Sequence, residues 1–487
     1  MSEGRSQRAA SSFLFKLLES FGTQGIAFVV NILLARLLSV EDYGVLSMLT
    51  IFIAISQVFV QSGLNTALIQ KKEVDDADTS SVFYTSLGIA VLLYAILFFA
   101  APAIGEYFHT PKLAPALRVL ALVLLPGALL SVQNAMAARE MGFRKLLITS
   151  LTATALSGGV GIGMALMGFG HWALVAQQLM NQCVQAVMLL FLLKWRPRPI
   201  FSMERMKVLL PFGSRLLLSS LLDTGYNKLR LTVIGRRFSS ETLGYYNRGQ
   251  QFPELMMNAV NGSIQSVMLP VLSEQQDDKA RLKELMRRSV MVSAFLVLPM
   301  MAGLAAVAEP LVGLLLTDKW LMCVPFLQIC CMDYAFYPIH TANLQAINAM
   351  GRSDVFLKLE LIKKAFGLVV LAVCVWVFDS VYAIAWGAVA STLFAAFVNA
   401  HPNRKLLGYG YGEQIKDVLP SGGMAAVMFL VVWLENGLPI GRVLKLMVQL
   451  LTGIAVYGGL TLLLRPRCWQ YLLELLKEFR HHERPGN

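Results

Sequence analysis

The chain has 487 residues, of which 56% are hydrophobic and 15% are charged, and its formal net charge is +12. A soluble domain carries about 25% charged residues and about 45–50% apolar ones, so this composition excludes an ordinary soluble protein. The apolar residues come in blocks, such as 82–104 and 446–464, that are long enough to cross the roughly 30 Å hydrocarbon core of a bilayer. We therefore predict an all-α polytopic membrane protein.

Counting these blocks along the chain predicts about 14 transmembrane helices. Their approximate centres are residues 24, 53, 92, 126, 157, 183, 221, 256, 297, 335, 368, 390, 425 and 454. The spans near 24, 221 and 256 are the least apolar, because polar residues interrupt them. Residues 1–12 are polar, and the first apolar stretch lacks the short core and small-residue cleavage site of a signal peptide. We expect this stretch to remain as the first span.

Basic residues are spread unevenly over the predicted loops. An even number of spans places both termini on one side, and the loops on that side hold most of the lysines and arginines. Such loops stay in the cytoplasm, so we predict that both termini are cytoplasmic. The positive net charge then reflects topology and attraction to anionic lipid headgroups, and it requires no nucleic-acid partner.

An internal repeat relates the two halves of the chain at an offset of 200 residues. ARLLSVEDYG (35–44) aligns without gaps to GRRFSSETLG (235–244), which pairs Arg36 with Arg236 and Gly44 with Gly244. Six predicted spans separate the copies, so both enter the membrane in the same direction. Parallel repeats of this kind predict two six-helix lobes with the substrate at a central cavity between them.

The repeat divides the chain into five predicted parts. These are an N-lobe with helices 1–6 at 1–195, a basic cytoplasmic linker at 196–207, a C-lobe with helices 7–12 at 208–403, two further helices at 412–465, and an amphipathic cytoplasmic tail at 466–487.

Polar residues inside the spans are the candidates for function, because each charge costs roughly 3 kcal/mol at the centre of a lipid-inserted helix. They gather in spans 1, 2, 7 and 8, where several follow the spacing of one helical face. The candidate substrate-binding residues are Lys16, Glu19, Gln57, Gln61, Asn65, Arg215, Asp223, Asn227, Lys228, Arg230, Arg248, Glu254, Asn258, Asn261 and Gln265.

Span 7 presents the clearest alternative between a structural and a functional interpretation. Asp223 and Arg230 can neutralise each other while they pack two helices together. One carboxylate cannot neutralise Arg215, Lys228 and Arg230 together, however, so surplus positive charge requires water or an anion. In span 11, Glu360 can form a private ion pair with Lys363 or Lys364, or these residues can have a role in the cavity. A GVGIG stretch at 159–163 contains the G-x-x-x-G spacing that lets helices pack closely.

The sequence contains none of the catalytic or metal-binding motifs for which we searched. It contains no Walker motif, no zinc-ligand spacing and no nucleophile elbow, and its six cysteines form no C-x-x-C pair. We predict that the protein is not an enzyme, that it holds no metal or cofactor, and that any energy coupling uses a proton or sodium gradient through Glu19, Asp223 or Glu254.

Several stretches resemble a known group. LLARLLSVEDYGVLSMLTIF (33–52), FHTPKLAPALRVLAL (108–122) and LLLTDKWLMCVPFLQIC (314–330) are similar to bacterial polysaccharide exporters of the multidrug/oligosaccharidyl-lipid/polysaccharide superfamily. The colanic-acid and teichuronic-acid type flippases are the most similar, over about residues 13–465. This resemblance implies two six-helix lobes plus two helices around a cationic cavity. It also implies a lumen-facing role for Arg215, Lys228, Arg230 and Arg248.

The resemblance further implies a function and its partners. The protein would flip undecaprenyl-pyrophosphate-linked oligosaccharides to the outer leaflet of the bacterial cytoplasmic membrane by alternating access, for surface polysaccharide assembly. Its expected partners are that lipid-linked glycan, the lipid bilayer and a polysaccharide polymerase with its chain-length machinery, and the protein itself would be a monomer.

Three alternatives remain open. A peptidoglycan-precursor flippase of the same fold would bring arginines into span 1, where this chain has Lys16 and Glu19. A multidrug exporter would favour an acidic, aromatic cavity. A membrane glycosyltransferase or polymerase would need a sizeable outer loop with catalytic residues, whereas every predicted outer loop is short.

Overall fold

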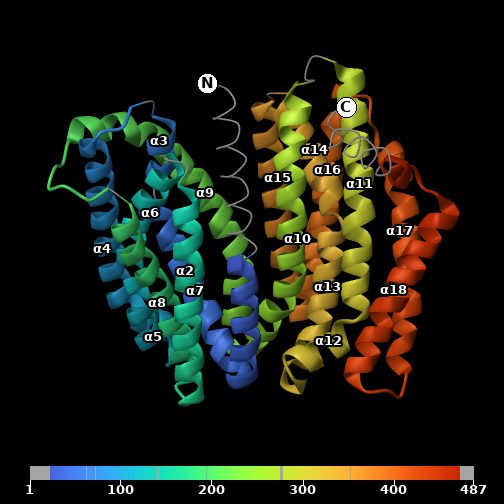
Figure 1. Ribbon diagram of the computed structural model, residues 1–487, viewed down its shortest axis with the longest axis horizontal. Coiled ribbons are helices and arrows are strands. Elements are labelled where there is room, and N and C mark those ends of the chain that lie inside the picture. Colours follow the sequence, from blue (N-terminus) through green and yellow to red (C-terminus); the bar gives the residue numbers. More distant parts are fainter. Residues whose placement is uncertain are drawn as a thin grey trace, which may run out of the picture. The chain divides into compact units, whose positions relative to one another are not determined.

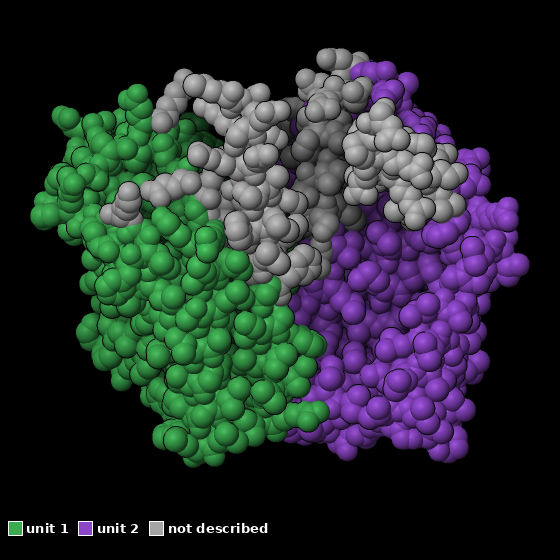
Figure 2. All heavy atoms as spheres, viewed as in Figure 1, with its two compact units in different colours: residues 1–244 green, residues 245–487 purple. Residues whose placement is uncertain are grey.

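The computed structural model describes residues 22–61, 63–71, 73–139, 142–193, 195–274, 278–350 and 352–471, without the side chains of 143, 212, 259, 261–274, 353 and 354. The described residues form helices joined by turns and short loops, with no strand among them, and they divide into two compact units, 1–244 and 245–487 (Figures 1 and 2).

Unit 1 begins with the helix Gly22–Leu37 and ends just inside α10. Its further elements are α2 (Val40–Gln61), α3 (Leu64–Gln70), α4 (Asp76–Tyr107), α5 (Leu113–Leu120), η1 (Ala121–Val123), α6 (Leu124–Arg139), α7 (Phe143–Leu166), α8 (His171–Leu192) and α9 (Met203–Arg237).

Unit 2 contains most of α10 and the rest of the chain. Its elements are α10 (Ser240–Glu274), α11 (Lys279–Ala306), α12 (Ala308–Leu315), η2 (Asp318–Cys323), α13 (Val324–Ala335), α14 (Tyr337–Ala349), α15 (Ser353–Val373), η3 (Cys374–Phe378), α16 (Val381–Leu406), α17 (Tyr411–Leu434), η4 (Glu435–Gly437) and α18 (Arg442–Leu464).

Eleven stretches among the described residues are long and apolar enough to cross a membrane. They coincide with eleven of the predicted spans, and the chain is therefore a multi-pass membrane protein. The three others are the least apolar ones. Residues 22–37 form a shorter apolar helix, while α9 and α10 have 35 residues each but carry many polar side chains. At 1.5 Å per residue, both exceed the thickness of the hydrocarbon core. The total of fourteen spans stays a prediction.

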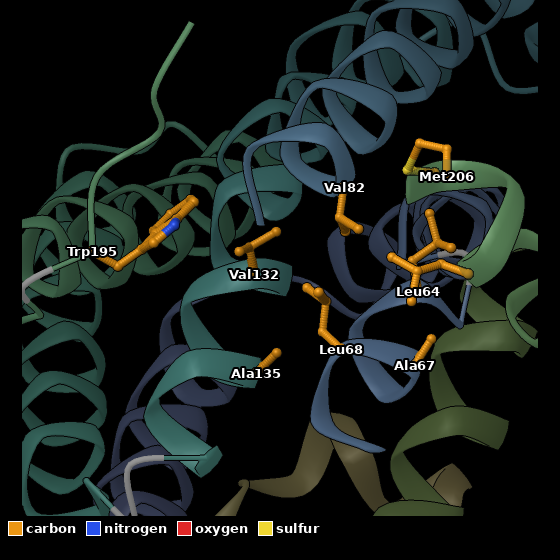
Figure 3. Close-up of a cluster of buried hydrophobic side chains, with 9 residues drawn as sticks. Leu64, Ala67, Leu68, Val82, Val132, Ala135, Trp195 and Met206 are labelled. Atoms are coloured by element: carbon orange, nitrogen blue, oxygen red, sulfur yellow. The ribbon is translucent and has the colours of Figure 1, made fainter. Parts of the chain in front are cut away.

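The core of unit 1 joins segments that are distant in sequence. Leu64 and Leu68 of α3 pack with Val82 of α4 and Val132 of α6 (Figure 3). The same cluster includes Trp195, which lies after α8, so the connection from α8 to α9 is packed into the unit. Segments from four parts of unit 1 thus meet in one close-packed apolar cluster.

Polar contacts fasten the same connection to the start of α4. Asp75 caps α4 by accepting a hydrogen bond from the backbone N–H of Asp78 at 2.8 Å, and this bond holds the pKa of Asp75 below its ordinary value. Arg205 pairs with Asp75 at 2.8 Å, and Arg198 pairs with Asp76 at 2.8 Å. The basic residues of the predicted linker therefore neutralise the acidic start of α4.

In unit 2, α17 and α18 pack onto α11. Met291 and Phe295 of α11 form a buried cluster with Met424 of α17 and Cys468. A second cluster joins Val307, after the end of α11, to Met428 and Val432 of α17. The two helices predicted to lie outside the repeat are thus part of the core of unit 2.

The junction between consecutive helices repeats at the predicted offset of 200. One helix ends at Leu37 and the next begins at Val40, just as α9 ends at Arg237 and α10 begins at Ser240. Ser39 accepts a hydrogen bond from the N–H of Asp42 at 3.1 Å, and Ser239 accepts one from Thr242 at 3.1 Å. The same serine cap therefore starts both second helices, which confirms the register of the repeat at this junction.

A glycine in each copy allows backbone segments to touch here. A Cβ on Gly44 would lie 1.7 Å from the carbonyl oxygen of Ser240, and a Cβ on Gly244 would lie 2.5 Å from that of Val40. In both cases the obstacle is backbone, which cannot rotate away. Glycine is required at these two matched positions because the helix starts approach too closely for any side chain.

Gly44→Ala should therefore lower the free energy of unfolding by about 1–3 kcal/mol, the usual cost of overpacking. Thermal unfolding of the detergent-purified protein measures this change. Gly88→Ala is the matched control, because Gly88 lies within α4 with no atom within 4 Å of an added Cβ. Its expected effect is zero or a slight gain in stability. Equal behaviour of the two variants would contradict the close approach at Gly44.

The predicted G-x-x-x-G packing at 159–163 differs from the structure. An added Cβ on Gly159 or Gly163 would meet nothing within 4 Å, whereas one on Gly158 would lie 2.5 Å from Val30 and one on Gly161 would lie 3.1 Å from Gln177. The close helix contacts therefore use Gly158 and Gly161. The prediction located the correct helix, but the two glycines of the motif, Gly159 and Gly163, lie on an open face of it.

Candidate functional site

Helix α9 carries the largest group of predicted site residues. The helix begins at Met203, after the capping residue Ser202, whose hydroxyl accepts a hydrogen bond from the N–H of Arg205, and it ends at Arg237. Arg215, Asp223 and Asn227 are exposed, whereas Lys228 and Arg230 are half-buried. All five lie within unit 1, so α9 alone displays a net positive polar surface along its length.

Two of the polar residues that share a face of α9, Asp223 and Asn227, are in contact. The Asn227 amide donates a long hydrogen bond of 3.4 Å to the Asp223 carboxylate one turn earlier. This bond aligns the two side chains along the helix axis. Arg215 lies two turns before Asp223 and thus outside the reach of this pair.

The amide residues of α2 and α3 lie beside the first half of α9. The helix is interrupted after Gln61, and Gly63 adopts a left-handed conformation with φ of 63°. A Cβ on Gly63 would lie 2.7 Å from the carbonyl oxygen of Gly213 and 2.8 Å from Cβ of Leu216, both in α9. Gln61 is exposed and Asn65 is half-buried. The interruption therefore brings Gln61 and Asn65, two of the predicted site residues, to the part of α9 that carries Arg215.

Gly63→Ala should disturb this arrangement twice. A left-handed conformation costs a non-glycine residue roughly 1–2 kcal/mol, and the new methyl group also collides with α9. Gly168→Ala separates these two effects, because Gly168 has φ of +82° but no atom within 4 Å of an added Cβ. We expect a larger loss of thermal stability at Gly63 than at Gly168. Equal losses would show that the contact with α9 contributes nothing.

Gln57 is the third predicted amide residue of this region. It is half-buried in α2, one turn before Gln61. The Asn65 side chain accepts a hydrogen bond from the backbone N–H of Thr66 at 2.8 Å. The Asn65 side chain is thus bonded to the neighbouring backbone, whereas the Gln61 side chain is exposed.

In unit 2, Arg248 of α10 is placed differently from the arginines of α9. It is 5% exposed, its guanidinium carbon lies 5.2 Å from the centre of the Trp320 ring, and it donates a hydrogen bond to Gln251. This is a cation–π contact in a packed environment. Glu254 and Asn258 are exposed on the same helix. Arg248 is thus packed inside unit 2, whereas Arg215 of α9 is exposed.

Four predicted site residues lie outside the described part. Lys16 and Glu19 precede the first described residue, and the side chains of Asn261 and Gln265 are not described. Residues 472–487 of the predicted amphipathic tail also lie outside.

One smaller prediction, about a buried charge, has a clear outcome. Glu360 and Lys363 form an ion pair at 2.5 Å, as the structural interpretation expected. The ring Nδ1 of His340 lies 2.8 Å from the amide nitrogen of Asn399 in α16. Among the described residues, no group of three or more His, Cys, Asp or Glu side chains could hold a metal ion.

A buried polar cluster in unit 2 was missed by the sequence reasoning. Arg287 of α11 makes two hydrogen bonds to the Asp417 carboxylate in α17, at 2.6 and 2.7 Å, and Tyr409 donates to the same carboxylate at 2.8 Å. Nearby, the amide groups of Asn343, Asn403 and Gln414 bond to one another. These partners are far apart in sequence, so no local spacing signals them.

Comparison with known proteins places the chain in a family. Residues 33–325 match the family described as polysaccharide biosynthesis protein, and this match spans more than half of the chain. The chain belongs to this family.

Relatives with known roles agree with this assignment. The succinoglycan biosynthesis transport protein ExoT of Rhizobium meliloti is 25% identical over 384 residues, which cover 79% of the chain and 75% of that protein. The teichuronic acid biosynthesis protein TuaB of Bacillus subtilis is 23% identical over 301 residues, or 61% of the chain and 62% of that protein. The lipopolysaccharide biosynthesis protein WzxC of Escherichia coli is 22% identical over 347 residues, or 70% and 69%.

Solved structures show the fold of this family member. The lipid II flippase MurJ, in an inward closed conformation, aligns with a TM-score of 0.76 at 15% identity over 93% of the chain and 99% of MurJ. An inward-facing multidrug resistance transporter of the MATE family aligns with a TM-score of 0.62 at 14% identity over 81% of the chain and 98% of that protein. At these identities the likeness concerns the fold alone, and it agrees with the predicted all-α membrane fold.

Proposed function

We propose that this protein flips an undecaprenyl-pyrophosphate-linked oligosaccharide from the inner to the outer leaflet of the bacterial cytoplasmic membrane, for the assembly of a surface polysaccharide. The observation that carries the proposal is the exposed polar surface of α9 with Arg215 and the half-buried Arg230. Family membership and the similarity to ExoT, a succinoglycan biosynthesis transport protein, support it. Movement of the substrate by alternating access is part of the proposal.

The internal repeat supplies a control for the charges on α9. The helix Gly22–Leu37 is the first copy of the second half of α9, and both copies end at the same register. The residues in the first copy that stand at the places of Asp223, Asn227, Lys228 and Arg230 are, in order, Thr23, Ala27, Phe28 and Val30. The first copy therefore builds the same helix with no charge at these places. Folding does not demand the charges, and this favours a functional role for them.

The chemistry of the arginines fits a pyrophosphate group. A guanidinium donates parallel hydrogen bonds to phosphate oxygens and keeps its charge at every physiological pH. Amide and carboxylate groups such as Asn227 and Asp223 are suited to the hydroxyl groups of sugars. In a membrane, binding of an anionic headgroup also offsets the cost of exposing Arg215 on a spanning helix.

The net charge of this surface weighs against the multidrug alternative. A cationic drug would be repelled by Arg215, Lys228 and Arg230, which outnumber the single carboxylate of Asp223. A peptidoglycan precursor is also a lipid-linked pyrophosphate, so charge does not separate it from other lipid-linked glycans. Membership of the family described as polysaccharide biosynthesis protein favours the broader glycan class.

Gene deletion in the native bacterium tests the proposed function. We expect loss of one surface polysaccharide and accumulation of its lipid-linked repeat unit in the inner leaflet, where periplasmic enzymes have no access to it. Restoration by the wild-type gene is the control. Normal polysaccharide without accumulation of a lipid-linked precursor would contradict the proposal, and increased drug sensitivity alone would favour the multidrug alternative.

A further inference from the structure

The exposed surface of α9 includes an apolar strip. Leu218, Leu222 and Leu229 are 60%, 57% and 36% exposed, and their spacing of i, i+4 and i+11 places them on one face. Other spanning helices expose leucines too, as α18 does at Leu450 and Leu451. Segment 446–464 of α18, however, contains no charged residue, and such a face requires nothing beyond bulk lipid.

A polar strip runs beside the apolar one on α9. Ser219, Asp223 and Asn227 are all exposed, and they follow one another at intervals of one turn. Each residue of a helix is rotated by about 100° from the one before it. Ser219 and Asp223 directly follow Leu218 and Leu222 in sequence, so the polar strip lies about 100° around the helix from the apolar strip and runs parallel to it.

Arg215 stands where the two strips meet. It precedes Leu218 by three residues and Ser219 by four, and both spacings bring side chains together on a helix. The exposed guanidinium is therefore flanked by the first residue of the apolar strip and by the first residue of the polar strip. This juxtaposition of a hydrocarbon surface, a cation and a hydroxyl-binding surface on one helix is the basis of the inference.

We propose that α9 binds the substrate as an amphiphile, with its polyprenyl chain along Leu218, Leu222 and Leu229, its pyrophosphate at Arg215, and its sugars along Ser219, Asp223 and Asn227. This inference rests on the proposed function and specifies the orientation of the substrate. The covalent order of a lipid-linked glycan is hydrocarbon, pyrophosphate, sugar. Around the circumference of α9, the apolar strip, Arg215 and the polar strip follow one another in the same order, and both strips run from Arg215 towards the C-terminal end of the helix.

The apolar strip has a specific role in this arrangement. Burial of hydrocarbon on the leucines gives little energy by itself, because lipid tails are as apolar as leucine. The strip instead keeps the first isoprene units beside Arg215, so that binding of the headgroup does not require the chain to leave the membrane. Selection for a long polyprenyl chain would then arise from its path along α9.

Site-specific photo-crosslinking tests the arrangement. Leu222→p-benzoylphenylalanine probes the apolar strip, Asn227→p-benzoylphenylalanine probes the polar strip, and Ile454→p-benzoylphenylalanine on α18 is the control at a position that is 72% exposed. Each purified variant is reconstituted with radiolabelled undecaprenyl-pyrophosphoryl-N-acetylglucosamine and irradiated. Unlabelled undecaprenyl pyrophosphate is the competitor, and thermal unfolding verifies that each variant is folded.

We expect labelling at 222 and 227 that exceeds labelling at 454 at least fivefold and that the competitor removes. Adding Arg215→Ala should lower labelling at both positions. If 227 is labelled in a competable manner while 222 behaves like 454, the chain does not follow the apolar strip, and the orientation is wrong although the proposed function stands. If neither position exceeds 454 in folded protein, both the orientation and the proposed substrate class are contradicted.

Discussion

Replacing Arg215 and Arg230 together by alanine should abolish export of the surface polysaccharide while the protein still folds and reaches the membrane. A hydrogen bond to a charged group contributes roughly 1.5–3 kcal/mol, so the loss of two arginine–phosphate contacts should lower transport by at least a hundredfold. The expected stability cost is small, because the first repeat copy holds uncharged residues at the matching places, Phe15 and Val30. Polysaccharide on the cell surface and protein in the membrane fraction are the two measurements.

Two control variants make this result specific. Arg215→Lys with Arg230→Lys keeps the charge but loses the bidentate geometry, and it should retain part of the activity. Arg404→Ala with Lys405→Ala removes the same amount of charge from the last turn of α16, and export should stay near the wild-type level. Normal export in the Arg215/Arg230 double-alanine variant would refute the cationic site on α9.

Asp417→Ala should be the most destabilising single substitution that we predict. The Asp417 carboxylate accepts two hydrogen bonds from Arg287 and one from Tyr409. Tyr409 is fully buried, and burial raises the pKa of its hydroxyl group, which therefore stays protonated and donates. Removing the carboxylate leaves these donors without their acceptor. We expect a loss of about 3 kcal/mol in the free energy of unfolding, at the lower end of the range for broken buried pairs.

Denaturation of the purified protein in mixed detergent micelles measures this loss. Tyr409→Phe removes one hydrogen bond from the same cluster and should cost about 1 kcal/mol. Glu284→Ala breaks the pair with Arg288, in which both side chains are about half exposed, and its effect should stay below about 0.5 kcal/mol. Similar losses for Asp417→Ala and Glu284→Ala would mean that the cluster does not hold α17 against α11.

Much of the fold could be predicted from the sequence, because the bilayer imposes simple rules. Long apolar blocks located eleven of the spans. The three predicted spans that are not among these eleven are those that polar residues interrupt. The offset of 200 predicted where helices restart, since a serine cap such as Ser39 leaves a local signal in each copy. Long-range packing left no such signal. The attachment of α17 to α11 depends on residues 130 positions apart, such as Arg287 and Asp417.

The candidate site could be predicted only in part. The polar residues of α9 were recognisable, because charge in an apolar helix is costly wherever the helix lies. Whether each charge is accessible or packed could not be predicted, since that depends on neighbours distant in sequence. Arg215 and Arg248 are alike in sequence terms, yet Arg215 is exposed and Arg248 packs against Trp320. The contact of Gly63 with α9 likewise follows from packing and not from spacing.

A flipping assay with purified protein tests the proposed function most directly. Proteoliposomes contain a fluorescent undecaprenyl-pyrophosphoryl-N-acetylglucosamine, and a membrane-impermeant quencher reports which leaflet holds it. We expect the wild-type protein to make the inner-leaflet pool accessible to the quencher, the Arg215→Ala/Arg230→Ala variant to leave that pool protected, and a fluorescent phosphatidylcholine to stay protected with either protein. If the lipid-linked sugar stays protected with the folded wild-type protein, or if phosphatidylcholine moves equally fast, then the protein is not a flippase for lipid-linked glycans.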